Sequence, residues 1–273
     1  MIRSAITISL VTEARGGPFV HWDGLEDGCA RAAAAGFDAV EIFPRSAGEL
    51  DAAALREILE RHRLSVAAIG TGAGWVAHRL RLTDRDPAVR ARAVEFISEV
   101  IDFAAAFGAP AIIGSMQGRA EGEVTREQAL DWLAEALEVL GSRAGTHGIP
   151  LIYEPLNRYE TNLVNTTAEG IALLRRLSHG HVRLLCDCFH MNIEEASIAD
   201  SLREAGPLVG HVHFADSNRR AAGLGHTDFA LIADALREIG YNGYLAAEIL
   251  PLPDAATAAD QTMRAFRQFF RKS

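Results

Sequence analysis

The sequence predicts an α/β fold, a single-domain (β/α)8 TIM barrel that spans residues 1–273. Short apolar runs alternate eight times with longer stretches of helical periodicity, and no proline-rich or low-complexity linker divides the chain. The length of 273 residues suits one barrel, since such barrels contain about 250 residues. Apolar residues make up 49% of the chain and charged residues 23%, the balance of an ordinary globular protein.

The eight expected strands are continuous apolar runs, as is typical of parallel strands that are buried on both faces. They are Ala5–Leu10, Ala39–Phe43, Ser65–Ile69, Ala111–Gly114, Pro150–Glu154, Arg183–Asp187, Gly210–Phe214 and Tyr244–Ile249. An open doubly wound sheet is the alternative, but it usually has a glycine-rich phosphate loop after its first strand. The residues after Leu10 read VTEARGG and lack that fingerprint, so the pattern favours the closed barrel.

The segments between these strands carry start and stop signals of helices. Asp86 precedes Pro87, which places a capping side chain before proline at the first helical position. Thr125 is followed three residues later by Gln128, and Thr166 by a glutamate, so both fit the capping box. Glycines stand where several helices should end, at Gly36, Gly108, Gly148 and Gly240.

Composition excludes several classes of partner. The 36 acidic and 27 basic residues give a formal net charge of −9, which repels phosphate backbones, so we expect no nucleic-acid partner. No run of 18 apolar residues exists, so we expect no membrane partner. Residues 1–10 lack the pattern of a secretory signal, and three cysteines make no disulfide framework. These observations predict a cytoplasmic protein.

Lysine chemistry is also excluded by composition. The only lysine is Lys272, beside the last residue of the sequence. A catalytic Schiff base needs a buried and positioned amine, which such a position rarely supplies. We therefore expect neither a lysine aldolase nor a pyridoxal mechanism.

Four side chains that can bind a metal stand at the ends of consecutive expected strands. Glu154 ends the fifth strand, Asp187 the sixth and Glu248 the eighth, and His213 lies near the end of the seventh. The spacings of 33, 26 and 35 residues each match about one strand–helix unit. Because the C-terminal ends of barrel strands meet at one face, these side chains should converge there. A carboxylate on an apolar strand is costly to bury unless it is paired or metal-bound.

Three carboxylates in one place need a counter-charge, which a divalent cation would supply. An oxygen-rich set with one imidazole favours Mn²⁺ or Mg²⁺, with Co²⁺ as a further candidate, over a thiolate zinc site. Six-coordinate geometry would leave two positions for substrate or water. The plainer alternative is that each acid caps a helix or forms a surface ion pair. His211 points to the same face as His213, and we expect it to lie one layer below.

Distinct motifs surround these four side chains. They are EPLNRYETN at 154–162, DCFHMN at 187–192, HFADSNR at 213–219, and Gly240-Tyr241 followed by Tyr244 and Glu248. In these motifs the chain resembles the sugar isomerase/epimerase superfamily with a xylose-isomerase-like barrel. Within that superfamily it is most similar to the D-tagatose/D-psicose (ketose) 3-epimerases. The resemblance is strong from about residue 150 to 250 and weaker before it.

The resemblance implies roles for individual residues. Those that match the family's ligands for a divalent metal, above all Mn²⁺, are Glu154, Asp187, His213 and Glu248. Glu154 and Glu248 also match the two catalytic carboxylates. The residues that match those holding the carbonyl end of the substrate are Glu160, His190 and Arg219. The family also implies a homodimer or homotetramer that acts on a small sugar.

The implied reaction is inversion of C3 of a free ketose through an enediolate. Glu248 would take the proton from one face of the sugar, and Glu154 would return one to the other face. The cation would bind the carbonyl and neighbouring hydroxyl oxygens and stabilise the developing charge. His213 would stay neutral as a ligand, with its other ring nitrogen bonded to a supporting partner.

The first half of the chain departs from the epimerase pattern. The loops at 11–15 and 115–119 are more similar to hydroxypyruvate-isomerase-like members of the superfamily. These loops line the far end of the substrate pocket, so the substrate stays open. The roles of Arg15, Trp75 and Arg119 stay open as well.

Four alternatives follow. One is an aldose–ketose isomerase of the hydroxypyruvate isomerase type, which moves a proton between C1 and C2. Another is a lyase of the same superfamily. A DNA-repair nuclease on a related barrel would carry extra histidines after the third and fourth strands, where this chain reads IGT at 69–71 and IGS at 113–115. The last is a sugar-binding subunit without activity, against which the presence of both glutamates argues.

Overall fold

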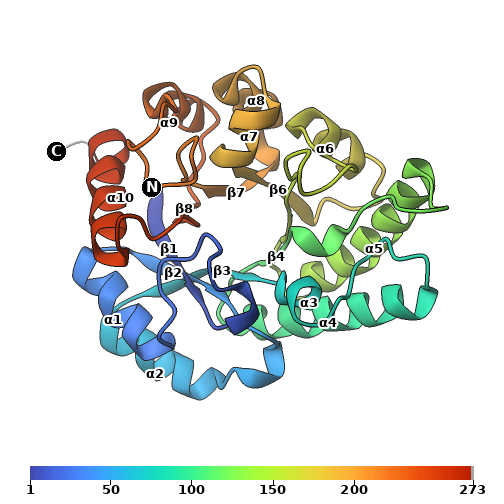
Figure 1. Cartoon of the computed structure of the whole chain (residues 1–273), viewed down its shortest axis with the longest axis horizontal. Coiled ribbons are helices and arrows are strands. Elements are labelled where there is room, and N and C mark those ends of the chain that lie inside the picture. Colours follow the sequence, from blue (N-terminus) through green and yellow to red (C-terminus); the bar gives the residue numbers. More distant parts are fainter. Residues whose placement is uncertain (272–273) are drawn as a thin grey trace.

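Eight parallel strands close into a barrel in the computed structural model, which describes residues 1–271 (Figure 1). Residues 272–273, and with them Lys272, lie outside the described part. Neighbours in sequence pair in order around the barrel, and β1 pairs with β8 to close it. The strands are β1 (Arg3–Ser9), β2 (Ala39–Phe43), β3 (Ser65–Gly70), β4 (Ala111–Ile113), β5 (Leu151–Tyr153), β6 (Val182–Asp187), β7 (Val209–His213) and β8 (Tyr244–Ala247).

Helices surround the strands and cover the outer face of the barrel (Figure 1). The α-helices are α1 (Leu25–Ala35), α2 (Ala52–His62), α3 (Ala73–Val76), α4 (Pro87–Ala105), α5 (Arg126–Thr146), α6 (Thr167–Leu174), α7 (Cys188–Glu194), α8 (Ile198–Ala205), α9 (Phe229–Glu238) and α10 (Ala255–Phe270). Short 3₁₀ helices are η1 (Thr12–Ala14), η2 (Ala47–Glu49), η3 (Ser115–Gln117) and η4 (Gly206–Leu208). The main core lies between the helices and the barrel.

Inside the barrel, small and branched apolar side chains fill the part below the strand ends. One cluster joins Ala5, Ala39, Ala67 and Ala246. A second cluster joins Ala68, Ile112, Ile152 and Leu185. Because side chains alternate along a strand, the residues two positions further on point into the same interior, nearer the C-terminal ends. There the chain turns polar, so the apolar clusters form a floor beneath a polar layer.

The expected closed barrel is confirmed, and the strand limits agree closely. The expected bounds of the second strand match β2, and the other strands differ by at most two residues at either end. The side chains of Asp86, Thr125 and Thr166 accept the capping hydrogen bonds, and the last two form capping boxes. The four expected glycines all have positive φ, with values of 91°, 62°, 71° and 69°. Gly36 is the C-cap of α1, and the others follow their helices by a few residues.

Among residues 1–271, no helix combines the length and the apolar character that crossing a membrane requires.

Two neighbouring positions on α5 test how the helix packs on the barrel. Leu137 is fully buried, whereas 58% of the Val139 surface is exposed. We expect Leu137→Ala to lower the free energy of unfolding by about 2–5 kcal/mol because it leaves a cavity. The control Val139→Ala should change it by less than about 0.5 kcal/mol. Urea unfolding followed by circular dichroism measures both, and equal losses would contradict this packing.

Candidate metal centre and active site

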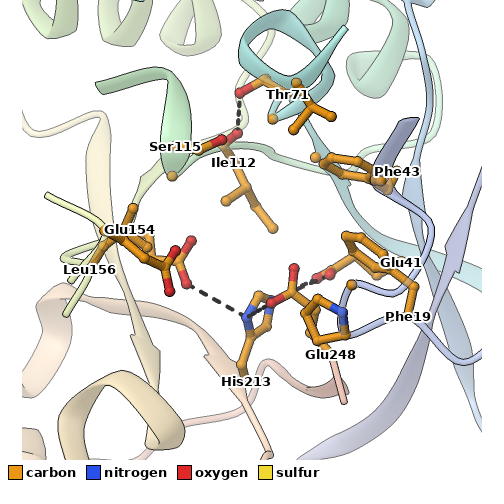
Figure 2. Close-up of a pocket in the computed structure, with 18 of the residues that line it drawn as sticks. Phe19, Glu41, Phe43, Thr71, Ile112, Ser115, Glu154, Leu156, His213 and Glu248 are labelled. Atoms are coloured by element: carbon orange, nitrogen blue, oxygen red, sulfur yellow. Dashed lines mark hydrogen bonds and ion pairs between the residues drawn. The ribbon is translucent and has the colours of Figure 1, made fainter. Parts of the chain in front are cut away.

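The four side chains expected to bind a metal all lie at one end of the barrel. Asp187 and His213 are the last residues of β6 and β7, where they pair in register. Glu154 and Glu248 follow directly after β5 and β8. Figure 2 shows Glu154 and Glu248 on either side of His213, around a shared space. The structure therefore brings the four predicted residues together.

The Nδ1 atom of His213 faces three carboxylates. It lies 3.3 Å from Asp187 Oδ2, 3.6 Å from Glu248 Oε2 and 3.7 Å from Glu154 Oε1. Adjacent ligands of an octahedral Mg²⁺-like ion are about 3 Å apart, so these atoms suit a common cation. Ligand atoms of Glu154, Asp187 and His213 all lie within 4.8 Å of one another. Glu248 lies outside that tighter set, and its carboxylate accepts a hydrogen bond from Arg219.

A buried oxygen atom without a hydrogen-bond partner also indicates a cation site. Glu154 Oε1 is buried and has no hydrogen-bond partner among the described residues. A buried charged oxygen without a partner is costly, and a cation would relieve that cost. Three carboxylates and an imidazole are a donor set that suits a hard divalent ion. The residues present therefore fit the metal that the sequence predicts.

The pKa shifts report how crowded these charges are. Burial, with added repulsion from Glu248 and Asp187, raises the pKa of Glu154 well above its usual value. Burial likewise raises the pKa of Glu248, although Arg219 and His213 oppose the shift. Burial also acts to raise the pKa of Asp187, but Arg219 and the nearby histidines outweigh it and hold the pKa below its usual range. The site thus separates one firmly ionised carboxylate from two that accept protons more readily.

Arg219 supplies the positive side chain of the site. Its guanidinium bonds the Glu248 carboxylate and lies 3.4 Å from Asp187 Oδ2. Its backbone φ is +58°, a left-handed conformation that a non-glycine residue adopts only when its surroundings hold it. Asp216 holds the loop, because its buried carboxylate accepts backbone hydrogen bonds from Gly223 and Gly225 at 2.8 Å each. The loop therefore presents the arginine to the strand ends.

His190 is oriented by a residue that the sequence analysis did not select. The amide of Asn157 lies 2.7 Å from His190 Nδ1 and donates 3.0 Å to Glu160 Oε1. An amide NH2 only donates, so Nδ1 accepts from Asn157 and the ring proton stands on Nε2, which lies 3.6 Å from Asp187 Oδ2. Burial lowers the pKa of His190, which favours the neutral ring. The arrangement leaves Nε2–H as a donor at the site.

A buried carboxylate within β2 was missed altogether. Glu41 lies beneath His213 and contacts both His211, at 2.7 Å, and His213. Burial acts to raise the pKa of Glu41, but His213 and His211 outweigh it and hold the pKa below its usual range. The position of His211, one layer below His213, agrees with the sequence expectation. The available signal for Glu41 was a single charge inside an apolar strand.

A cavity of about 530 Å³ opens above these groups, in the size range of small-molecule sites. Glu154, Glu160, His190, His213, Arg219 and Glu248 all line it. The wall away from the carboxylates is largely apolar, and Figure 2 shows part of it. Its apolar residues include Phe19, Phe43, Val76 and Ile112, whereas Leu156 and Phe189 line the cavity on the side of the carboxylates, two residues after Glu154 and Asp187.

Arg15, Trp75 and Arg119, whose roles the sequence leaves open, lie in different places relative to the cavity. Arg15 lines the cavity, from the loop that follows β1. Arg119 instead donates a hydrogen bond of 3.2 Å to the Tyr159 carbonyl. Trp75 packs against the main core, and the guanidinium groups of two arginines lie over its ring. Of these three residues, Arg15 is the one that reaches the cavity wall.

The ends of β3 and β4 bear on the nuclease alternative. Gly70 and Thr71 at the end of β3, and Gly114 and Ser115 at the end of β4, line the cavity. Among the described residues, the only histidines in the cavity wall are His190 and His213, which follow β6 and end β7. The extra histidines expected of a three-metal nuclease therefore do not occur at these strand ends.

Comparisons with known proteins identify the family. The family model described as xylose isomerase-like TIM barrel matches residues 29–269. An L-ribulose 3-epimerase from Methylomonas sp. is 34% identical over 81% of this chain and 76% of its own length. A D-psicose 3-epimerase from Agrobacterium fabrum is 32% identical over 84% of this chain and 78% of its own length. These findings confirm the resemblance seen in the motifs.

Solved structures of similar proteins agree with this family assignment. The crystal structure of a D-allulose 3-epimerase from Methylomonas sp. has a TM-score of 0.82 to this chain at 27% identity, and the match covers 99% of each chain. The chain therefore belongs to the xylose isomerase-like TIM barrel family, in which its relatives are ketose 3-epimerases, enzymes of the isomerase class.

Proposed function

We propose that this chain is a metal-dependent sugar epimerase that inverts C3 of a free ketose. The observation that carries the proposal is the pair Glu154 and Glu248, whose carboxylates flank His213 Nδ1 at 3.7 and 3.6 Å. Two carboxyl groups on either side of one substrate position can serve its two faces. The relatives named as 3-epimerases of L-ribulose and D-psicose support the same reaction.

In the proposed mechanism, Glu248 removes the C3 proton from one face of the ketose. Glu154 then returns a proton to the opposite face, which inverts the carbon. In the metal-free protein burial raises the pKa of both groups, and a carboxylate with a raised pKa is a stronger proton acceptor. Glu154, Asp187, His213 and Glu248 would hold a divalent cation, which would act as a Lewis acid and stabilise developing negative charge on the substrate oxygens.

Three further residues would hold the substrate. His190 Nε2–H and the Arg219 guanidinium both face the carboxylates, so they can donate hydrogen bonds to oxygens at the carbonyl end. Glu160 lies beside His190, with Oε1 3.8 Å from Nδ1, and lines the cavity. These polar contacts gather at one end of the cavity, so recognition should concentrate on the carbonyl end of the sugar.

The finer properties are proposals as well. We take Mn²⁺ as the physiological metal, because it accepts the mixed oxygen and nitrogen donor set in six-coordinate geometry. We also propose a cytoplasmic homodimer or homotetramer that binds neither nucleic acid nor membranes. The net charge of −9 supports the exclusion of nucleic acid.

Replacing either catalytic glutamate tests the mechanism. We expect Glu154→Gln and Glu248→Gln each to lower kcat for a ketose by at least about 100-fold, because the amide cannot transfer the proton. D-Fructose, D-tagatose and hydroxypyruvate serve as substrates, with product chromatography and solvent-deuterium incorporation as measurements. A product altered at C1 and C2 would favour the isomerase alternative.

The matched control is Asp102→Asn, which changes an exposed carboxylate that pairs with Arg143 on the outside of the barrel. It should retain wild-type kcat. Turnover close to wild type in both glutamine variants would defeat the assignment of the two bases.

Metal removal tests the charge balance of the site. After exhaustive chelation the enzyme should lose essentially all turnover, because within the described part of the chain Arg219 is the one arginine or lysine whose side chain the structure places against the carboxylates, and it already pairs with Glu248 and Asp187. Added Mn²⁺ should restore it, as followed by the rate of ketose conversion. Full activity in protein shown to be metal-free by elemental analysis would rule out the role given to the cation.

The raised pKa of Glu154 predicts a pH dependence of stability. Between its ordinary value of 4.5 and the raised value, the folded metal-free protein binds more protons than the unfolded chain. The free energy of unfolding should therefore fall as pH rises through this window. Glu154→Gln removes that loss, so its stability relative to wild type should increase with pH. Urea unfolding in chelator at several pH values measures the difference, and a constant difference would contradict the shift.

A further inference from the structure

The Glu41 carboxylate is enclosed by three side chains from two other strands. Thr7 on β1 donates from Oγ1 to Glu41 Oε1 at 3.1 Å. His211 on β7 lies with Nε2 2.7 Å from Glu41 Oε2. His213, also on β7, has Nε2 3.3 Å from Oε1 and 3.4 Å from Oε2. Only 3% of the Glu41 surface and 1% of that of each histidine is exposed.

These contacts decide how His213 can present its ring. An imidazole has two nitrogens, and an ionised carboxylate accepts hydrogen bonds but donates none. Nε2 of His213 therefore carries a hydrogen where it faces Glu41. The lone pair needed by a cation is then left for Nδ1, which is the atom that faces Asp187, Glu248 and Glu154.

The orientation of the ring is also restrained. The rings of His211 and His213 meet edge to face, with centroids 5.6 Å apart and an interplanar angle of 83°. Both rings share the same carboxylate, and Thr7 bonds that carboxylate from the neighbouring strand β1, where it is the register partner of Glu41. Rotation of the His213 ring would break its contact with Glu41 in a place that water does not reach.

We infer that Glu41 is a positioning residue that holds His213 in the tautomer and orientation required to bind the catalytic cation. The inference rests on the proposed function, since it concerns the affinity for that cation. Glu41 acts through His213, because its own oxygens are engaged by Thr7, His211 and His213. Partners of this kind typically change metal affinity by 10–100-fold.

A second cation among Glu41, His211 and His213 is the competing interpretation, since their ligand atoms also lie within 4.8 Å of one another. The 2.7 Å separation between His211 Nε2 and Glu41 Oε2 is that of a direct hydrogen bond. The donor from Thr7 further fills the carboxylate. The geometry therefore favours a network of hydrogen bonds with one cation above it.

The test measures binding of Mn²⁺ to the metal-free full chain by electron paramagnetic resonance of the free ion. We expect Glu41→Gln to weaken binding by 10–100-fold, because the amide also donates and so permits the wrong tautomer of His213. We also expect the Mn²⁺ concentration for half-maximal activity to rise in proportion. At saturating Mn²⁺, kcat should fall by less than about tenfold, since Glu41 does not transfer the proton.

Two further variants keep the test decisive. Thr7→Val removes one donor to Glu41 with little change of shape, and it should weaken Mn²⁺ binding by about 2–5-fold even if Glu41→Gln fails to fold. The matched control is Asp38→Asn, which alters a carboxylate that bonds Ser4 and Arg271 just before β2. It should lower the melting temperature and leave Mn²⁺ affinity unchanged.

The outcomes of these experiments distinguish failure of the proposed function from failure of the role given to Glu41. If the wild-type chain binds no divalent cation, the proposed function fails. If the wild type binds Mn²⁺ and both Glu41→Gln and Thr7→Val bind it equally well, only the role of Glu41 is overturned. Binding of two ions per wild-type chain, with one lost in Glu41→Gln, would also overturn it in favour of a second metal site.

Discussion

The concentration of negative charge inside the barrel mouth is the constraint on which the site depends. Glu154, Asp187 and Glu248 meet around one imidazole nitrogen, where burial removes most of the water that would otherwise screen them. Like charges this close cannot all stay ionised unless positive charge is supplied. Arg219 supplies part of it and a divalent cation would supply the rest. Burial, with added repulsion from the neighbouring carboxylates, raises the pKa of the two glutamates, so they accept protons more readily than an exposed glutamate does.

The barrel meets this constraint by stacking three layers. Apolar clusters close the interior at the bottom, and Glu41 with its hydrogen-bond partners forms a polar layer above them. The carboxylates and His213 then open to the cavity. Glu154, Asp187 and Glu248 each stand two residues after an apolar residue of these clusters, and Glu41 stands two residues after Ala39. The side-chain alternation of a strand therefore aims all four carboxylates into the interior above the apolar clusters. A shift of one residue in β7 would turn His213 away from both Glu41 and the cation site.

How much could be predicted from the sequence depends on where each partner lies along the chain. Glu154, Asp187, His213 and Glu248 were predictable, because each stands at the end of an apolar run and barrel strands all end at one face. Glu41 was not, since it lies within a strand and its partner His211 is 170 residues away. β7 is not a neighbour of β1 or β2 in the barrel, so the contact between His211 and Glu41 across the interior exists only in three dimensions. Asn157 was missed for a similar reason, since its partner His190 lies on the helix after the next strand.

The division of the cavity explains why the chemistry was easier to predict than the substrate. The reacting end is made of charged residues whose types and spacing are constrained by the reaction itself. The far wall is built from apolar side chains on the loops and strands of the first half, with Arg15 at its edge. Apolar contacts discriminate weakly between sugars that differ in a distant hydroxyl, because no buried polar group is left unpaired by the wrong one. Selectivity should therefore come from the shape of this wall and from the polar side chains in it, which are Glu13, Arg15, Thr71 and Ser115.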